Sequence, residues 1–343
     1  MTFNEVRKDY LLDRWVVIAT KRSRRPTDFI KKRETAERGD CPLCSGKEHM
    51  TPPAILVYIK SNSGIRKAKD KNGLRHKDWL IRCVPNLYPA FSPLKARGDT
   101  MRTIERDDLT IAVGHHEVLV ESPVHDEHPA DADTAQLVHV VNAYIDRLRE
   151  LSSKPYVKYV SIFRNHGLEA GASLSHAHSQ IIATPFTPTI VKEELAASRR
   201  SYIKNSTCAF CDMLEKEINS PRLIHENMDY VVFAPWASVN PLEFWILPKK
   251  HETTLLEMSR SEVKAFAETL RACLGGLKKL LNDPPYNFGF HIALNKNASK
   301  YYHWHLEVYP RLAIWAGFEK STGMYINTVT PETAAASLRK HIS

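Results

Sequence analysis

The sequence predicts an α+β protein built from one module that occurs twice along 343 residues. In each half a C-x-x-C pair is followed by a single histidine and then by a His-x-His segment. The single histidine stands 51 residues before the His-x-His in the first half and 52 residues before it in the second. Each half also combines short apolar runs with one long amphipathic helix. We therefore expect two tandem domains, each a mostly antiparallel sheet with a main helix.

Apolar residues at helical spacing predict the two main helices. The first covers roughly residues 131–152, with its apolar positions following Asp133, and the second covers roughly 261–281, with Ser261 as its N-cap. Residues 64–78 are polar and basic and are expected to form a surface loop. Apolar and β-branched runs predict the strands, which we place at residues 15–20, 55–60, 117–121, 157–163, 179–184, 230–234, 243–247, 287–294 and 305–309.

A third helical stretch, at residues 186–206, is interpreted as a connector between the halves. The N-terminal domain then covers residues 1–185 and the C-terminal domain residues 207–343. Because the halves repeat one module, the positions at which they differ should mark the half that carries the chemistry.

The composition fits a soluble globular protein, with 43% apolar and 25% charged residues. No apolar run approaches the roughly 18 residues of a membrane span, and the charged N-terminus is not that of a signal peptide. Four of the six cysteines stand in C-x-x-C pairs, which favours metal sites in a reducing cytoplasm over disulfides. The net charge of +9 favours an anionic partner, either nucleic acid or a phosphorylated small molecule.

The cysteine pairs and the histidines form two candidate zinc sites. Zinc favours a tetrahedron of thiolate sulfur and imidazole nitrogen, and a C-x-x-C turn supplies two of the four ligands. The first set is Cys41, Cys44, His125 and His176. The second set, by symmetry of the repeat, is Cys208, Cys211, His251 and His303. A degenerate copy whose cysteines are merely buried is the alternative for the second set.

The halves differ just after the first histidine of each His-x-His. If His176 binds metal, the period of two in a strand puts His178 on the same face, close to the site but free. A neutral imidazole there can attack phosphorus and form a covalent phosphoramidate. Gln180, again on that face, can donate its amide to phosphoryl oxygens, whereas Glu307 in the equivalent place would repel phosphate. The first half is therefore predicted to be catalytic, with an ordinary strand histidine as the alternative interpretation of His178.

Two other segments contain residues that can bind a phosphate group. Asn165, Gly171 and Ser173 lie on a polar approach to the same strand, where a hydroxyl and backbone amides can cradle a phosphate group. The arginines of the turn near residue 24, among them Arg22 and Arg25, can clamp phosphate oxygens bidentately. The alternative interpretations are an ordinary loop for the first segment and a solvated basic turn for the second.

Taken together, these motifs resemble the galactose-1-phosphate uridylyltransferase branch of the histidine-triad superfamily. The similarity runs along nearly the whole chain, through RWVVIATKRSRRP, CPLC, VPNLYPAF, ESPVH, FRNHG, GASLSHAHSQ, CAFC, WILPKKH, HWHLEVYPR and AGFEKSTGMYIN. The resemblance implies a ping-pong transfer, in which a histidine takes the nucleotidyl group of a nucleoside-diphosphate sugar, releases sugar 1-phosphate and passes the group to a second phosphate. It also implies a homodimer in which the C-terminal segment of one subunit completes the site of the other.

Residues of this chain that stand at matching positions are expected to have the roles of their counterparts in the family. The resemblance implies that His178 is the nucleophile and Gln180 its phosphoryl partner. Ser173 would contact the phosphoryl group being displaced, and Arg25 other phosphate oxygens.

The resemblance also implies which residues contact the substrate, and the sequence departs from the family pattern at two positions. Asn86 and Asn165 fall where the family holds the nucleotide, and Glu319 falls where it holds sugar hydroxyls. Uridylyltransferases usually carry glycine at the position of Ser179, and a glutamine that helps bind hexose at the position of Tyr325. The HAHSQ form, the second C-x-x-C and the ending GFEKSTGMYIN look more like ADP-glucose phosphorylases.

The resemblance leaves the second metal site open. Some relatives bind a second metal through a glutamate near the linker and three C-terminal histidines, here Glu194, His291, His303 and His305. The presence of Cys208 and Cys211 favours the repeat-symmetric zinc set, and the two sets would compete for His303. Without a metal role, His305 is interpreted as a relic of the duplication or a packing residue.

The leading hypothesis is a nucleotidyltransferase of the galactose-1-phosphate uridylyltransferase type, acting on a UDP-sugar and hexose 1-phosphate without an organic cofactor. The alternative is adenylyl transfer of the ADP-glucose phosphorylase type, with an ADP-sugar and phosphate. A zinc-ribbon protein that binds nucleic acid is a remote alternative, because the basic residues are scattered and His178 and Gln180 would have no role. We therefore expect no nucleic-acid or membrane partner. The base, the sugar and the pathway stay open.

Overall fold

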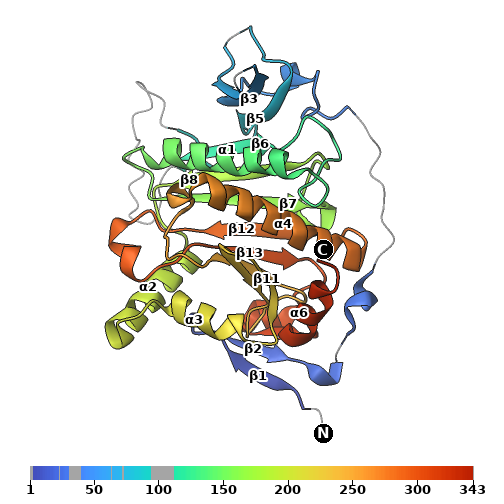
Figure 1. Cartoon of the computed structure of the whole chain (residues 1–343), viewed down its shortest axis with the longest axis vertical. Coiled ribbons are helices and arrows are strands. Elements are labelled where there is room, and N and C mark those ends of the chain that lie inside the picture. The colour runs from blue at the N-terminus through green and yellow to red at the C-terminus, as the bar shows by residue number, and fades with distance from the viewer. Residues whose placement is uncertain are drawn as a thin grey trace.

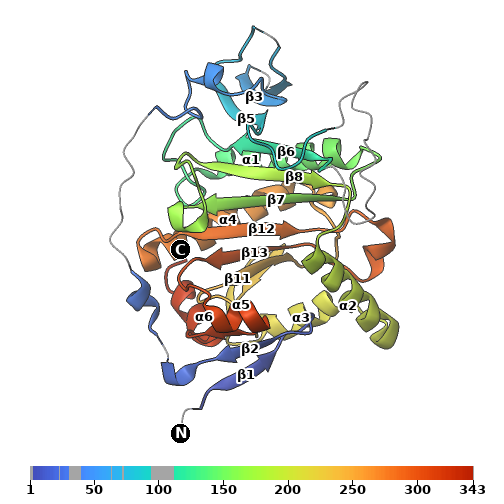
Figure 2. The ribbon, with the colours of Figure 1, turned by 180° about the vertical axis from the view of Figure 1, so that it is seen from behind.

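The computed structural model describes residues 3–22, 24–30, 40–62, 64–71, 73–93 and 112–342. Figure 1 shows one large twisted sheet with the helices α1 and α4 packed side by side on one face. Figure 2 shows the opposite face, on which these two helices lie behind the strands. The predicted α+β class is confirmed. No helix in the described ranges is long and apolar enough to cross a membrane.

The large sheet has 11 strands within the described residues, in the order β4-β3-β5-β6-β8-β7-β12-β13-β11-β10-β9. The strands are β3 (Leu56–Ser61), β4 (Gly64–Ala68), β5 (Trp79–Pro85), β6 (His115–Val120), β7 (Tyr159–His166), β8 (His178–Thr184), β9 (Leu223–Glu226), β10 (Tyr230–Phe233), β11 (Phe244–Pro248), β12 (Tyr286–His291) and β13 (His305–Pro310).

The order of the strands repeats the duplication seen in the sequence. The series β7-β8-β6-β5-β3 in one half corresponds to β12-β13-β11-β10-β9 in the other. The two equivalent strands at the middle, β7 and β12, pair antiparallel and join the halves into one sheet. Residues 186–206, interpreted as a connector, contain the helix α2 (Thr189–Asn205), which is followed by α3 (Ala209–Ile218).

The two main helices follow from their caps and apolar stripes. α1 (Thr134–Ser152) starts at Asp133, whose carboxylate accepts from the backbone N–H of Gln136. α4 (Arg260–Leu281) starts at Ser259, which forms a capping box with Glu262. The prediction of Ser261 as N-cap was wrong by two residues, because Ser259 alone has a suitable partner three positions on. Both helices bury their apolar faces against the sheet in one core.

A smaller sheet joins the two ends of the chain. It contains β1 (Glu5–Lys8), β2 (Trp15–Ile18) and β14 (Tyr325–Asn327), with β14 parallel to β2. Both views place this sheet, with the C-terminal helices α5 (Gly317–Thr322) and α6 (Pro331–Arg339), at the end of the molecule formed by the C-terminal half (Figures 1 and 2). The N-terminal residues therefore pack on the half that is distant from them in sequence.

The region around residues 64–78 differs from its prediction as a loop. β4 pairs with β3 at the edge of the large sheet, with most of its side chains exposed. Exposed polar and basic residues are typical of an edge strand as well as of a loop, so composition alone misled the prediction. Short 3₁₀ turns complete the described structure at Thr20–Arg22, Pro26–Phe29, Glu48–Met50, Leu168–Ala170, Leu255–Glu257 and Lys296–Lys300.

Candidate active site and metal centres

The strand β8 carries the predicted nucleophile at its first residue. Ser179 points to the helix side of the sheet, where its hydroxyl hydrogen-bonds with Tyr144 of α1 and donates to the buried carboxylate of Glu121. Side chains alternate along a strand, so His178 and Gln180 lie on the opposite face of the sheet, the open face, which α1 and α4 do not cover. This is the arrangement that the spacing predicted.

The imidazole of His178 is held in one tautomer. Its Nδ1 lies 2.8 Å from the backbone oxygen of His176, and a carbonyl oxygen can only accept, so Nδ1 carries the proton. The atom Nε2 then keeps its lone pair. Burial lowers the pKa of His178, which is 7% exposed, and so favours the neutral ring. A neutral imidazole with a free Nε2 is a nucleophile.

The open face beside His178 is lined by amides whose orientations are fixed. Gln180 Oε1 lies 2.8 Å from Nε2 of His116 on β6. Asn165 Oδ1 accepts from Asn287 of β12 at 2.8 Å, and Asn287 also donates to the carbonyl of Ala170. The amide nitrogens of Gln180 and Asn165 are thereby left for other acceptors.

Two of these partners, His116 and Asn287, were missed by the sequence analysis. The only available signal for His116 was its place one residue before the predicted strand 117–121, in phase with Val118 and Val120. Asn287 gave no signal beyond being polar at the start of a predicted strand. It comes from the C-terminal half, so the open face uses residues of both halves.

The approach to β8 bends at Gly171. This residue ends the 3₁₀ turn Leu168–Ala170 with φ +86°, a left-handed conformation that disfavours other residues. An added Cβ would stand 3.8 Å from Nδ2 of Asn165, so the glycine lies next to that amide. Ser173 follows and is exposed. Asn86 lies beside His116, and its Oδ1 accepts from the backbone N–H of Tyr88.

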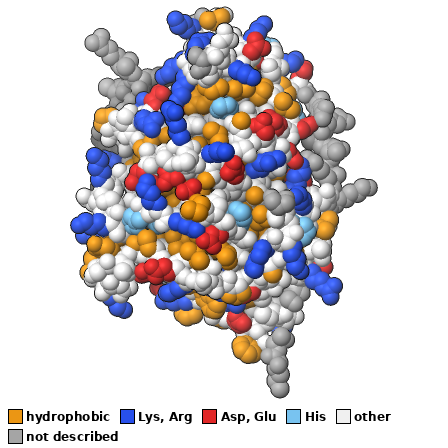
Figure 3. Space-filling model, in the orientation of Figure 1, with side chains coloured by type: hydrophobic (Ala, Val, Ile, Leu, Met, Phe, Trp, Pro, Cys, Tyr) orange, Lys and Arg blue, Asp and Glu red, His pale blue; other side chains and the backbone are white. Residues whose placement is uncertain are grey.

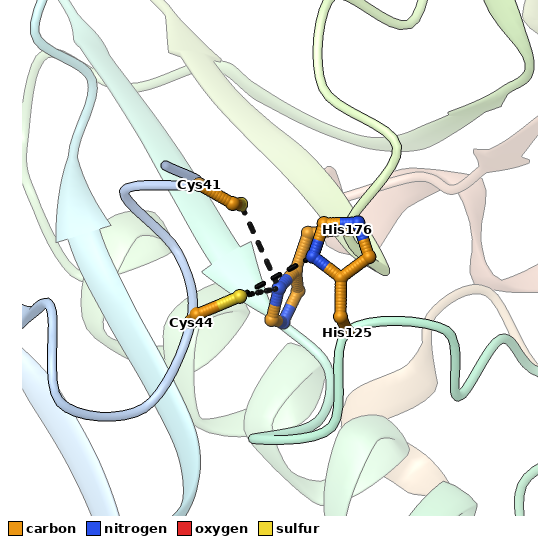
Figure 4. A group of neighbouring side chains, drawn as sticks. All are labelled: Cys41, Cys44, His125 and His176. Atoms are coloured by element: carbon orange, nitrogen blue, oxygen red, sulfur yellow. Dashed lines mark hydrogen bonds between the residues drawn. The ribbon is translucent and has the colours of Figure 1, made fainter. Parts of the chain in front are cut away.

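The first predicted metal set is assembled (Figure 4). The Nδ1 atom of His125 lies 3.2 Å from Sγ of Cys44, and Nδ1 of His176 lies 3.5 Å from that sulfur and 3.8 Å from Sγ of Cys41. Tetrahedral zinc, with bonds of about 2.3 Å to sulfur and about 2.0 Å to nitrogen, places such atoms about 3.5 Å apart. The other ring nitrogens are engaged, since Nε2 of His176 donates to the Ser122 carbonyl and Nε2 of His125 lies 2.9 Å from Ser175 Oγ. The four residues fit zinc.

The second predicted set is assembled in the same way. One ligand atom from each of Cys208, Cys211, His251 and His303 lies within 4.8 Å of the others. The Nδ1 atom of His251 faces the Cys211 sulfur at 3.2 Å, and its Nε2 donates to the Ser299 carbonyl. The cysteines lie at the start of α3, with Cys208 as its N-cap residue. The donor set again fits zinc.

A third group of ligand-type side chains lies in the C-terminal half. It contains Glu194, His291, His305 and Glu307, whose ligand atoms all lie within 4.8 Å of one another. Burial alone would lower the pKa of His291, but the carboxylates of Glu194 and Glu307 raise it to about 9. The expected competition for His303 is absent, because His303 faces Cys211 and Glu307 takes its place in this group. The sequence analysis missed Glu307 as a member.

His305, which stands at the position of His178 in the second copy of the repeat, thus has different surroundings. The Nδ1 atom of His305 also lies 3.2 Å from the backbone oxygen of the residue two positions earlier. Its Nε2, however, faces Glu307 at 3.3 Å and Glu194 at 4.0 Å. A carboxylate pair repels phosphate, so of these two equivalent histidines His178 has the surroundings that suit attack on phosphorus.

Three predicted substrate residues lie outside the strands that carry His178, Gln180 and Asn165. Arg22 and Arg25 belong to the N-terminal segment and are exposed, and Glu319 accepts from the N-terminal Ala316 N–H of its own helix α5. Figure 2 shows α5 and β2 at one end of the molecule, with β7, β12 and β13 between them and β8. Tyr325, at the position of the expected glutamine, lies in β14 with its ring 4.8 Å from that of Trp315.

The charged surface bears on the nucleic-acid alternative. On the face drawn in Figure 3, Lys and Arg side chains alternate with Asp and Glu among the described residues and form no continuous basic stripe. A stripe is the pattern expected of a surface that follows a phosphate backbone.

Comparisons with known proteins identify relatives of the whole chain. A family model described as a domain of unknown function, DUF4921, matches residues 112–343. ADP-glucose phosphorylase of Arabidopsis thaliana is 31% identical over 98% of this chain and 92% of its own length. Galactose-1-phosphate uridylyltransferase of Thermotoga maritima is 30% identical over 98% of both chains.

Solved structures extend the similarity to the fold. The Arabidopsis ADP-glucose phosphorylase with bound ADP-glucose superposes with a TM-score of 0.80 and 30% identity, over 98% of this chain and 99% of that one. A uridylyltransferase structure gives 0.72 and 27%, over 99% and 98%. The fold and these relatives define an enzyme of the nucleotidyltransferase class. The chain belongs to the galactose-1-phosphate uridylyltransferase family, in which both named activities occur among its relatives.

Proposed function

We propose that this enzyme transfers a nucleotidyl group from a nucleoside-diphosphate sugar to a second phosphate through a covalent intermediate on His178. The observation that carries the proposal is the bond between Nδ1 of His178 and the His176 carbonyl, which aims a neutral Nε2 at the open face. Nε2 attacks the α-phosphorus, the bond from that phosphorus to the bridging oxygen breaks, and sugar 1-phosphate leaves with the bond's electron pair. An oxygen of the second phosphate then attacks the same phosphorus and releases His178.

The remaining residues of the open face would bind the phosphoryl oxygens. The Gln180 amide nitrogen faces away from His116 and would donate to the oxygens of the α-phosphate, where negative charge grows in the transition state. Gly171 and Ser173 would hold the phosphate that is displaced. Asn165, whose amide oxygen is already engaged, would donate its N–H groups to the nucleotide.

Adenylyl transfer, with ADP-glucose as donor and phosphate as acceptor, is the first candidate for the reaction. It is supported by the TM-score of 0.80 to the ADP-glucose phosphorylase, against 0.72 for the uridylyltransferase structure. It reverses the preference drawn from sequence motifs alone. Uridylyl transfer to hexose 1-phosphate is the second candidate, supported by the Thermotoga maritima relative.

Zinc would occupy both Cys₂His₂ sets and hold the ends of the strands in place. The donor atoms and their separations support this. The Glu194, His291, His305 and Glu307 group offers carboxylate and imidazole ligands, which suit another divalent cation. Cysteine pairs of this kind need reduced thiols, so we place the enzyme in the cytoplasm.

A homodimer would complete the site. Arg22 and Arg25 belong to the N-terminal segment, and Glu319 belongs to α5 at the end of the molecule away from β8 (Figure 2), so a second copy would bring such residues to His178 when they bind substrate. Light scattering at micromolar concentration should then report twice the mass of one chain.

The donor can be identified directly. Purified enzyme is incubated with ADP-glucose, UDP-glucose or UDP-galactose, each with phosphate or with hexose 1-phosphate, and the products are separated by chromatography. Release of ADP and glucose 1-phosphate from ADP-glucose and phosphate supports the first candidate. A new UDP-sugar formed only with hexose 1-phosphate supports the second. Turnover with no pair of substrates would contradict the proposed function.

A further inference from the structure

A histidine on the strand next to β8 is bonded to the predicted phosphoryl partner. In the register of β6 and β8, Val118 stands opposite Gln180, so His116 lies two residues away on the same face. Nε2 of His116 lies 2.8 Å from Oε1 of Gln180. This contact joins two side chains 64 residues apart in sequence.

The proton in this contact can be placed from the neighbouring atoms. The backbone N–H of Ala90 donates to Nδ1 of His116 at 3.1 Å, so Nδ1 holds a lone pair and the neutral ring carries its proton on Nε2. The Tyr88 N–H binds Asn86 Oδ1, so Asn86 faces the same Nε2 with its amide nitrogen, and an amide nitrogen cannot accept a hydrogen bond. The Nε2 proton is therefore donated to Gln180.

Accepting this proton determines which way the Gln180 amide points. A glutamine amide can turn by 180° about its last torsion and exchange its oxygen for its nitrogen with little intrinsic cost. With Oε1 bound to His116, the NH₂ group faces the open side near His178. In the reversed orientation Oε1 would face the oxygens of a phosphate and repel them.

The two halves of the chain supply an internal comparison. By the repeat, His116 corresponds to Leu242 and Gln180 to Glu307. Leucine cannot donate, and a carboxylate has two equal oxygens with no orientation to choose. The histidine and the amide thus occur together in the half with His178 and are both replaced in the other half.

We propose that His116 is a positioning residue for nucleotidyl transfer, which holds Gln180 in the amide orientation that donates to the phosphoryl oxygens. The inference rests on the proposed function of His178. It assigns His116 no contact with the reacting atoms, and its effect passes through Gln180.

A double-mutant cycle tests this role. The rate at which the nucleotidyl group appears on the enzyme is measured by rapid quench and intact mass for wild type, His116→Phe, Gln180→Leu and the double variant. We expect His116→Phe to slow this step by about 10- to 100-fold, of the order of losing one aimed donor, with little change in the half-saturating donor concentration. In the Gln180→Leu background the same change should have almost no further effect.

Rescue and control variants separate positioning from a structural role. His116→Gln can place a donor where Nε2 was and should recover most of the rate, whereas His225→Phe, on the remote strand β9, should match wild type. Thermal unfolding and zinc content verify that each variant is folded. Effects of His116→Phe and Gln180→Leu that multiply, or a His116→Phe rate equal to wild type, would overturn the inference while the proposed function stands. A wild-type enzyme that forms no adduct would overturn both.

Discussion

The Nδ1 atom of His178 lies 2.8 Å from the backbone oxygen of His176. His176 directs its own Nδ1 toward the sulfurs of Cys41 and Cys44, so its ring belongs to the first candidate zinc set while its carbonyl sets the tautomer of His178, the proposed nucleophile. The candidate zinc set and the proposed nucleophile are therefore joined through a single residue. A structural zinc placed here would fix the position at which β8 begins.

Removing one ligand of this centre should lower both zinc content and the rate of nucleotidyl transfer. For Cys44→Ser we expect one zinc per chain fewer than wild type and a rate at least about 10-fold lower, because second-sphere supports of a reactive group typically carry effects of this size. Zinc is measured by elemental analysis of the purified protein. Cys273→Ala, a buried cysteine of α4 outside both sets, is the control and should keep the wild-type zinc content. Equal zinc in Cys44→Ser and wild type would contradict this centre.

Ser179→Gly introduces the residue that uridylyltransferases usually carry, and it should leave donor preference unchanged. The Ser179 side chain is buried on the helix side, bonded to Glu121 and Tyr144, and does not reach the open face. The change removes a hydrogen bond to a carboxylate and should lower the free energy of unfolding by about 2 kcal/mol. Urea denaturation and the ratio of rates with ADP-glucose and UDP-glucose measure the two effects. A switch of that ratio would show that Ser179 does set specificity.

Asn287→Leu should weaken nucleotide binding although the residue belongs to the C-terminal half. Asn287 donates to Asn165 and to the Ala170 carbonyl, and without it the Asn165 amide is free to turn. Loss of one oriented hydrogen bond, about 1 kcal/mol, should raise KM for the donor roughly 5-fold. Asn142→Leu serves as the comparison, because among its described contacts the Asn142 amide donates only to the Val138 carbonyl of the same helix α1. An unchanged KM would remove Asn287 from the site.

The region that carries the first C-x-x-C pair should become less stable in acid, because Asp70 loses its charge there. Burial alone would raise the pKa of Asp70, but hydrogen bonds from the backbone N–H groups of His76 and Ala54 and from the side chains of His76 and Arg82 lower it to about 2. A folded-state pKa below the unfolded value means that the stabilisation is complete above about pH 4 and is lost as the pH falls toward 2.

The corresponding measurement compares wild type with Asp70→Asn. The free energy of unfolding at pH 6 should be about 2 kcal/mol lower in the variant, and the difference should shrink between pH 4 and pH 2. A constant difference over that range would mean that the carboxylate charge contributes nothing.

The two cysteine–histidine sets could be predicted because the sequence contains them twice, and His178 with Gln180 could be predicted because the two copies differ there. The matched intervals identified both Cys₂His₂ sets, and the period of two along β8 placed His178 and Gln180 on one face. His116 and Asn287 could not be found this way, because their partners lie on neighbouring strands and the pairing register is set by the folded sheet. The third group was predicted with His303 as a member, but His303 faces Cys211 and Glu307 stands in the group instead. The edge strand β4 was taken for a loop because its exposed face has loop-like composition.

The most direct test of the account is to locate the nucleotidyl group. The enzyme is incubated briefly with the donor it accepts, its intact mass is recorded, and the modified peptide is sequenced by mass spectrometry under alkaline conditions that preserve phosphoramidates. The account predicts one nucleotidyl mass per chain, attached to His178, absent in His178→Ala and present in His225→Ala. A nucleotidyl group on another residue, or full turnover by His178→Ala, would contradict it.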